Sequence, residues 1–142
     1  MEPTTETNQE QIRFWNEQGG PRWVRLQQQL DAQINQLGLF AMQRAAVQPG
    51  DQVMDVGCGC GQAALELAER VGPQGTVLGV DISTPMLARA RERQRERGLK
   101  NLAFLQADAQ TYRFRTSFAI HYSVQSSRPV VRRGLPAAND RV

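Results

Sequence analysis

Cysteine, histidine and long apolar runs are scarce in this sequence, and each scarcity excludes a class of protein. The 142 residues include two cysteines and one histidine, which are too few for a disulfide framework or a zinc site. No run approaches the ~18 consecutive apolar residues of a membrane-spanning helix. Residues 1–10 are polar and acidic, unlike a secretory or mitochondrial presequence. We therefore expect a soluble, cytoplasmic chain that binds no metal.

Lysine is also scarce, because 16 of the 17 basic residues are arginine. Residues 1–112 carry 11 basic and 13 acidic side chains, whereas residues 113–142 carry six arginines and one aspartate. A basic tail can bind nucleic acid, but these arginines are scattered, and nucleic-acid binding is not expected. The arginine run Arg89–Arg97 is interleaved with Glu92 and Glu96, which favours a solvated, ion-paired helix face.

The first third of the chain has a helical pattern. Between residues 11 and 47, apolar side chains recur at spacings of three and four, and the pattern is interrupted by a Gly-Gly-Pro run at residues 19–21. We predict a disordered leader over residues 1–10 and a helical cap over residues 11–47. Gly38 is expected to break or bend the last helix of this cap.

Strand and helix patterns alternate after residue 48. Two successive β-α-β units predict right-handed crossovers, and therefore an α/β fold. We expect an incomplete doubly wound, mostly parallel Rossmann-like sheet with helices on both faces. The predicted elements are strands at Gln52–Val56, Thr76–Val80 and Leu102–Gln106 and helices at Gln62–Val71 and Thr84–Arg97.

The C-terminal residues carry weaker signals. Residues 118–124 alternate apolar and other side chains, which permits one more half-buried strand and a partial core over residues 48–125. Residues 126–142 hold two prolines and no apolar period. We predict that they form a basic, irregular tail without further elements.

A glycine-rich loop follows the first predicted strand. Gly57, Gly59 and Gly61 allow the backbone to approach a ligand, and N–H groups of the next helix point at it. A dinucleotide-binding loop would place its third glycine where this chain has Gln62. Asp55 would repel a pyrophosphate and suits a positive ammonium group. The loop favours a cationic, adenosine-bearing ligand without phosphates, and S-adenosylmethionine fits.

Two further carboxylates follow the next predicted strands. Asp81 ends the second strand, where an acid can accept both hydroxyls of a ribose. Asp108 follows the third strand, where its carboxylate can accept the amine of adenine while the Ala109 N–H donates to a ring nitrogen. One such acid alone is more often a turn residue or a helix cap. Three acids at three successive strand ends favour a ligand site.

Residues 51–112 resemble the class I, seven-stranded S-adenosylmethionine-dependent methyltransferases. The segment Val53–Gly61 matches the first motif of that family, residues 80–82 match its second-strand acid and residues 106–109 match its adenine motif. The resemblance implies that the first strand lies between the second and the fourth. The cofactor-binding residues that it implies are Asp55, Gly57, Cys58, Gly59, Gly61, Asp81, Ile82, Asp108 and Ala109.

The N-terminal residues carry a second resemblance. Four segments are similar to those of small-molecule methyltransferases of the ubiquinone/menaquinone-biosynthesis type: Phe14-Trp15-Asn16, Gly20, Arg22-Trp23-Val24 and Leu30-Asp31. In that family the helices before the first strand cover the cofactor and help to shape the substrate pocket. The resemblance makes Trp15, Asn16 and Trp23 substrate or lid candidates, although each also suits simple helix packing.

The C-terminal part departs from this family, in which three further strands and their helices follow the fourth strand. We expect a C-terminally truncated or frameshifted methyltransferase that acts on a small-molecule acceptor. One alternative is a non-catalytic remnant that at most binds the cofactor. A second is an NAD(P)-binding oxidoreductase domain, which Asp55 and Gln62 disfavour. No residue is assigned as a catalytic base, and no motif indicates the acceptor or the oligomeric state.

Overall fold

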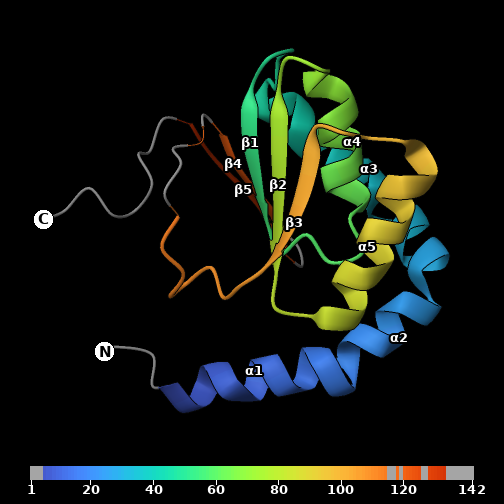
Figure 1. Cartoon of the computed structure of the whole chain (residues 1–142), viewed down its shortest axis with the longest axis vertical. Coiled ribbons are helices and arrows are strands. Elements are labelled where there is room, and N and C mark those ends of the chain that lie inside the picture. The colour runs from blue at the N-terminus through green and yellow to red at the C-terminus, as the bar shows by residue number, and fades with distance from the viewer. Residues whose placement is uncertain (1–4, 115–117, 119, 126–127, 134–142) are drawn as a thin grey trace, which may run out of the picture.

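The computed structural model describes residues 5–114, 118, 120–125 and 128–133. Three helices come first, strands and helices then alternate, and two strands end the described part (Figure 1). The alternation predicted for residues 52–106 is confirmed, with one boundary extended to Asp81. The elements are α1 (Thr5–Glu17), α2 (Gly19–Arg25), α3 (Gln27–Ala45), β1 (Gln52–Val56), α4 (Gln62–Val71), β2 (Thr76–Asp81), α5 (Thr84–Arg97), β3 (Leu102–Gln106), β4 (Ile120–Gln125) and β5 (Arg128–Arg133).

β1 lies inside a five-stranded sheet of order β3-β2-β1-β4-β5. It pairs in parallel with β2 and β4, β2 pairs in parallel with β3, and β5 runs antiparallel beside β4. The predicted mostly parallel, Rossmann-like sheet is confirmed, as is the position of the first strand between the second and the fourth. The order reverses at β1, and in open α/β sheets ligands bind at the carboxyl ends of the strands near such a point.

The helices α3, α4 and α5 cover one face of the sheet (Figure 1). The expectation of helices on both faces is therefore wrong for the part of the chain that the structure describes. Both crossovers lead outward from β1, first to β2 and then to β3, and right-handed crossovers in one direction place their helices on one side. On the opposite face, Phe114 and Phe118 pack against the sheet.

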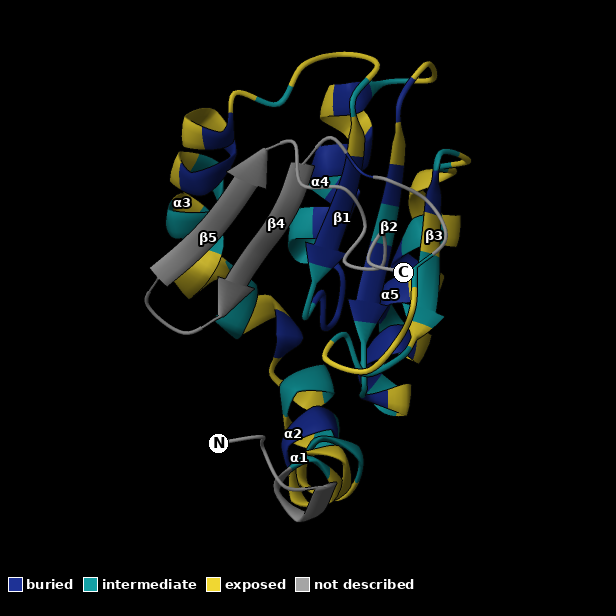
Figure 2. Ribbon diagram, turned by 90° about the vertical axis from the view of Figure 1, so that its left-hand side faces the viewer, coloured by how far each residue is buried: buried dark blue, intermediate teal, exposed yellow. Residues whose placement is uncertain are grey.

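Apolar side chains form two clusters that follow the alternation of the strands. Val53 and Val77 pack with Leu65 and Leu87 of the helices, whereas Met54 belongs to the cluster on the other face. Because alternate residues of a strand share a face, Asp55 lies on the same face as Val53. Figure 2 shows β1 as a largely buried strand, so Asp55 enters an apolar environment.

The N-terminal helices correct two predictions. α1 begins at Thr5, so residues 5–10 are helical rather than part of a disordered leader, and Asn8 within them bonds to Asp108. α3 continues through Gly38 without a break. Three residues after Gly38 on α3, Ala41, Met42 and Ala45, are buried, and their packing outweighs the cost of about 1 kcal/mol for glycine inside a helix.

The C-terminal strands confirm one prediction and correct another. β4 matches the strand predicted over residues 118–124, although it begins at Ile120. β5 lies within residues 126–142, which were predicted to be irregular. Two β-branched residues follow Pro129, and β5 is an edge strand, where a missing N–H is tolerated. The rest of the predicted tail lies outside the described residues.

Candidate functional site

The acids singled out in the sequence lie near one another at one edge of the sheet. Asp55 is in β1, Asp81 ends β2, and Asp108 comes two residues after β3. The arrowheads of these strands point toward the end of the molecule where α1 and α2 lie (Figure 2). The loop of residues 57–61 joins β1 to α4 at this edge, as predicted.

Glycine conformation shapes this loop. Gly57, Gly59 and Gly61 have φ angles of 74°, 54° and 87°, in the left-handed region that other residues disfavour. The N–H groups of Gly57 and Cys58 both donate to the carbonyl of Val80, at 2.8 and 3.1 Å. The loop is therefore tied to β2 at its first half before it turns into α4.

Asp81 connects the loop to the start of α5. Its Oδ2 accepts the Gly59 N–H at 2.8 Å, and its Oδ1 accepts the Ser83 N–H at 2.9 Å. Each carboxylate oxygen has a further lone pair, so the group can accept donors from a ligand while it holds the loop. The neighbouring candidate Ile82 contributes its carbonyl, which accepts a bond from Asn16 Nδ2 at 3.0 Å.

Asp55 is the most buried of the three acids, with an exposed fraction of 2%. Its Oδ2 has no hydrogen-bond partner among the described residues. Burial, together with the nearby charge of Asp81, raises the pKa of Asp55 from 3.8 to about 8. Because a buried, unpaired carboxylate is unfavourable, this position favours either a proton or a cationic group.

Burial also raises the pKa of both thiols in the loop. The pKa of Cys58 lies well above its ordinary value because of desolvation and, next, the charges of Asp55 and Asp81. Desolvation raises the pKa of Cys60 to about 11. A neutral thiol is a poor nucleophile and a poor metal ligand. The contribution of Cys58 to the loop geometry is its backbone N–H.

Asp108 is held by its own turn and by α1. Its Oδ1 accepts the Gln110 N–H at 2.9 Å, and its carbonyl accepts the Tyr112 N–H at 2.8 Å. Asn8 Nδ2 donates to Oδ2 of the same carboxylate. Ala109 packs against the apolar cluster on the face opposite the helices. The contact of Asn8 was missed by sequence reasoning, because no motif links α1 to the end of β3.

Two of the three lid candidates, Trp15 and Asn16, attach α1 to the segment after β2. Asn16 Oδ1 accepts the Thr84 N–H at 2.9 Å, and the Trp15 carbonyl accepts the Ser83 hydroxyl at 2.7 Å. The rings of Trp15 and Trp23 meet edge to face, with centroids 6.3 Å apart. The structure therefore brings the N-terminal helices to the edge of the sheet that carries the acids.

Gly20 permits this close docking. It is buried in α2, and a Cβ there would lie 2.0 Å from the Trp15 carbonyl oxygen and 2.4 Å from Ser83 Oγ. Both distances are shorter than any real contact of such atoms, and one of them involves backbone. A side chain at this position would therefore separate α2 from the start of α5.

Arg93 is a second residue that sequence reasoning missed. It belongs to the run Arg89–Arg97, which was predicted to form a solvated face, but its exposed fraction is 7%. Its guanidinium donates to the carbonyl of Cys60 at 2.8 Å, which ties α5 to the glycine loop. The prediction holds for Arg89, which pairs with both glutamates of the helix.

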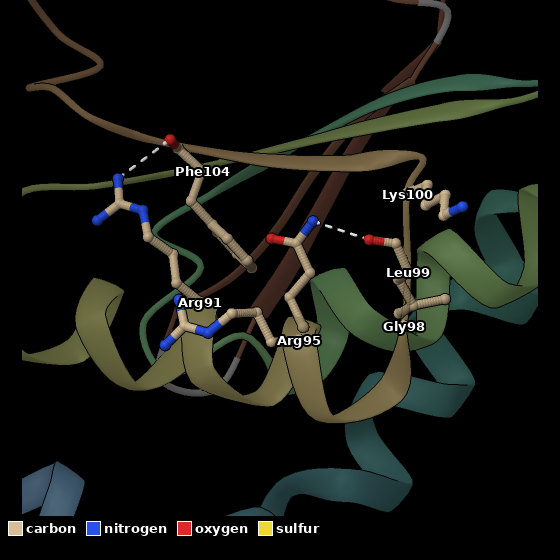
Figure 3. A pocket seen from close by; sticks show the side chains of 7 residues that line it. Arg91, Arg95, Gly98, Leu99, Lys100 and Phe104 are labelled. Atoms are coloured by element: carbon tan, nitrogen blue, oxygen red, sulfur yellow. Dashed lines mark hydrogen bonds between the residues drawn. The ribbon is translucent and has the colours of Figure 1, made fainter.

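A cavity of about 370 Å³ lies away from this site. It is formed by the last turns of α5, the following turn and β3, as Figure 3 shows. There Arg91 donates to the Phe104 carbonyl at 3.2 Å, and Gln94 donates to the Leu99 carbonyl at 3.0 Å. The turn that lines it precedes β3, whereas the acids follow the carboxyl ends of the strands.

No group of three or more His, Cys, Asp or Glu side chains among the described residues is arranged to hold a metal ion. No helix in the same part of the chain is both long and apolar enough to cross a membrane.

A parallel sheet with a glycine loop after its first strand and acids after the next strands is the architecture of a Rossmann-like, cofactor-binding protein. Within this class, the sequence model of a family described as a methyltransferase domain matches residues 48–123. The match covers more than half of the chain. The chain therefore belongs to this methyltransferase-domain family, and the resemblance noted in the sequence is confirmed.

Individual relatives agree with this assignment. The chain is similar to aklanonic acid methyltransferase DauC of Streptomyces sp. (strain C5), with 45% identity over 62 residues that cover 44% of this chain and 28% of that protein. It is 41% identical over 68 residues to demethylmenaquinone methyltransferase of Geobacillus kaustophilus (strain HTA426), covering 48% and 29% of the two chains. The matched segments thus span less than a third of these relatives.

Among solved structures, the chain is similar to a SAM-dependent methyltransferase from Geobacter sulfurreducens in complex with S-adenosyl-L-homocysteine. The TM-score is 0.53 and the sequence identity is 25%, and the match covers 66% of this chain and 36% of that one. The two proteins are therefore similar both in sequence and in the course of the backbone.

Proposed function

We propose that this chain binds S-adenosylmethionine and serves in the methylation of a small molecule. The observation that carries the proposal is the buried Asp55, whose Oδ2 lacks a partner among the described residues at the base of a glycine loop. A ligand with a positive ammonium group and no phosphate would satisfy this carboxylate. Family membership and relatives that are methyltransferases support the same cofactor.

The proposed roles follow the positions of the acids. Asp55 and the Gly57–Gly61 loop hold the methionine end of the cofactor. Asp81 accepts the ribose hydroxyls with the lone pairs that its bonds to backbone N–H groups leave free. Asp108 and the Ala109 N–H recognise adenine. The remaining proposed cofactor contacts are Cys58, through its backbone, and Ile82.

The helical cap over residues 11–47 closes the site in this proposal. Trp15, Asn16 and Trp23 belong to α1 and α2, and Asn16 and the Trp15 carbonyl bond to the segment after β2. Helices anchored there exclude water from the proposed methionine and ribose positions, and a dry site strengthens electrostatic contacts. The core of the proposed domain spans residues 48–125.

When bound, S-adenosylmethionine supplies an electrophilic methyl group on a positively charged sulfur. The residues of this chain orient that ligand and keep water away, and the chemistry depends largely on positioning. The relatives named for aklanonic acid and demethylmenaquinone support a small-molecule acceptor. We further propose a cytoplasmic location, because two cysteines are too few for the disulfide framework of a small secreted domain.

The test is calorimetric titration of the folded chain with S-adenosylhomocysteine and, separately, with NAD. We expect the first ligand to bind and the second not to bind, because Asp55 opposes a pyrophosphate. Transfer of a labelled methyl group to a panel of small hydroxyl, amine and carbon acceptors then separates an enzyme from a chain that only binds. A folded chain that binds NAD in preference to S-adenosylhomocysteine would refute the proposal.

A further inference from the structure

Arg93 occupies an unusual position for an arginine on a charged helix. Its Nη1 donates to the Cys60 carbonyl at 2.8 Å. Its Nη2 donates to the side-chain carbonyl of Gln62 and lies 3.1 Å from Asp31 Oδ2. One guanidinium therefore contacts the end of the glycine loop, the first residue of α4 and the second turn of α3.

The burial of this ion pair is costly. The exposed side-chain fractions of Arg93 and Asp31 are 8% and 15%, and burial lowers the pKa of Arg93 despite the opposing effect of Asp31. Arginine stays protonated in proteins, so its charge is retained. Buried pairs of this kind add little net stability compared with apolar packing, and where they persist they often serve to specify one conformation.

The contacts of the loop indicate which conformation is specified. Asp81 accepts the N–H of Gly59 at 2.8 Å, and the next residue, Cys60, gives its carbonyl to Arg93. The two bonds therefore connect adjacent residues of the loop to the end of β2 and to α5. Gly61 then turns into α4 with a φ of 87° and no side-chain cap.

A second set of bonds joins this arrangement to the helical cap. Gln27 Nε2 donates to Asp31 Oδ2 at 2.6 Å, and Arg89 Nε donates to Gln27 Oε1 at 3.2 Å. The carboxylate of Asp31 is thus held on α3 while it pairs with Arg93. The carboxylate of Asp31 therefore connects the position of α3 with the conformation of the loop.

We infer that Arg93 is a positioning residue, which together with Asp31 fixes the Gly57–Gly61 loop in the conformation that receives the cofactor. The inference rests on the proposed cofactor site. Arg93 acts through the Cys60 carbonyl and not through contact with the reacting atoms. A lysine cannot replace it, because one ammonium cannot reproduce the planar set of donors to three acceptors.

The first measurement needs no ligand. Arg93→Met combined with Asp31→Asn removes both charges, so no buried charge is left unpaired. Amide hydrogen exchange is followed at Gly61, which donates to Cys58 within the loop, and at Gly72, at the far end of α4. We expect exchange at Gly61 to be faster by about tenfold and exchange at Gly72 to change little, since local opening is separable from global unfolding.

The second measurement is the affinity for S-adenosylhomocysteine, determined below the melting temperature of each variant. We expect the double variant to bind about tenfold more weakly, a difference of about 1.4 kcal/mol. Arg97→Met is the matched control, because Arg97 lies one turn further along α5 and pairs with Glu69 on the surface. It should leave both exchange and affinity unchanged. Arg93→Lys should resemble the double variant.

Selective exchange at Gly61 together with weaker binding supports the inference. Equal acceleration at Gly61 and Gly72 overturns it, because Arg93 would then stabilise the fold as a whole. Faster exchange at Gly61 with unchanged affinity also overturns it, as does unchanged exchange. If the wild-type chain binds no S-adenosylhomocysteine, the proposed function fails, and the ratio of the two exchange rates still decides whether Arg93 holds the loop.

Discussion

Replacement of Asp55 by asparagine is expected to stabilise the folded chain near neutral pH while it weakens the site. The pKa of Asp55 is raised from 3.8 to about 8 by burial and by the charge of Asp81. Between these two values, folding takes up a proton, because the unfolded carboxyl is ionised and the folded carboxyl is not. The free energy of unfolding therefore falls as the pH rises through this window.

The magnitude follows from the linkage relation. One bound proton changes the free energy of unfolding by about 1.4 kcal/mol for each pH unit. Between pH 5 and pH 7, Asp55 should lower the stability of the wild-type chain by about 3 kcal/mol relative to a neutral residue. Above pH 8 the effect levels off, because the folded carboxyl also ionises. Asp55→Asn keeps the shape of the protonated side chain but removes its contribution to the pH dependence of the free energy of unfolding.

Urea unfolding at pH 5, 6, 7 and 8 measures the difference in the free energy of unfolding between Asp55→Asn and the wild-type chain. Far-UV circular dichroism and tryptophan fluorescence should give coincident transitions, which licenses a two-state treatment. Glu69→Gln is the control, because its carboxylate is largely exposed. If the stability difference between Asp55→Asn and wild type is the same at pH 5 and pH 7, the carboxyl is ionised in the folded chain and the reasoning is wrong.

Three other outcomes test the site. Affinity of the wild-type chain for S-adenosylhomocysteine, measured by calorimetry, should rise from pH 6 to pH 8 by at most about tenfold per pH unit, because the ligand requires ionised Asp55. The affinity of Asp55→Asn should not depend on pH. A wild-type affinity that stays constant over this range would contradict the prediction. Asp81→Asn should weaken that affinity by about 1–3 kcal/mol, and equal affinity would remove Asp81 from the site. Gly20→Ala should lower the free energy of unfolding by about 1–3 kcal/mol, because the alanine Cβ would clash with the Trp15 carbonyl. An unchanged midpoint of urea unfolding would show that α2 does not pack against α1 and α5 as described.

The central elements were predictable because their signals are local. The boundaries of β1, α4, α5 and β3 match the periodicity of the sequence. The glycines at residues 57–61 indicate the loop between β1 and α4. The acids at the strand ends were also identified, because parallel strands bring their carboxyl ends to one edge. Each of these inferences needs only a short window of sequence and one rule of topology.

The parts that were missed depend on contacts between distant segments. Arg93 and Arg97 share one helix face by spacing, yet only Arg93 is buried, because Asp31 of α3 and the Cys60 carbonyl lie against it. Residues 5–10 have no apolar period, and their docking near Asp108 is visible only in three dimensions. β5 was missed because its pattern is short and its stability as a strand comes from pairing with β4.

The two buried ionisable groups beside the loop, Arg93 and Asp55, are expected to affect stability in opposite directions. Arg93 has acceptors on three elements, so loss of its charge alone leaves Asp31 unpaired and should cost about 3–5 kcal/mol of stability. Asp55 Oδ2 has no hydrogen-bond partner among the described residues, and burial keeps this carboxyl protonated below about pH 8, so its replacement by asparagine should add stability near neutral pH. A buried carboxyl whose replacement stabilises the chain contributes nothing to folding, which agrees with the proposed role of Asp55 in binding a cationic ligand. Opposite signs for Arg93→Met and Asp55→Asn would therefore support a structural role for the first group and the proposed cofactor role for the second.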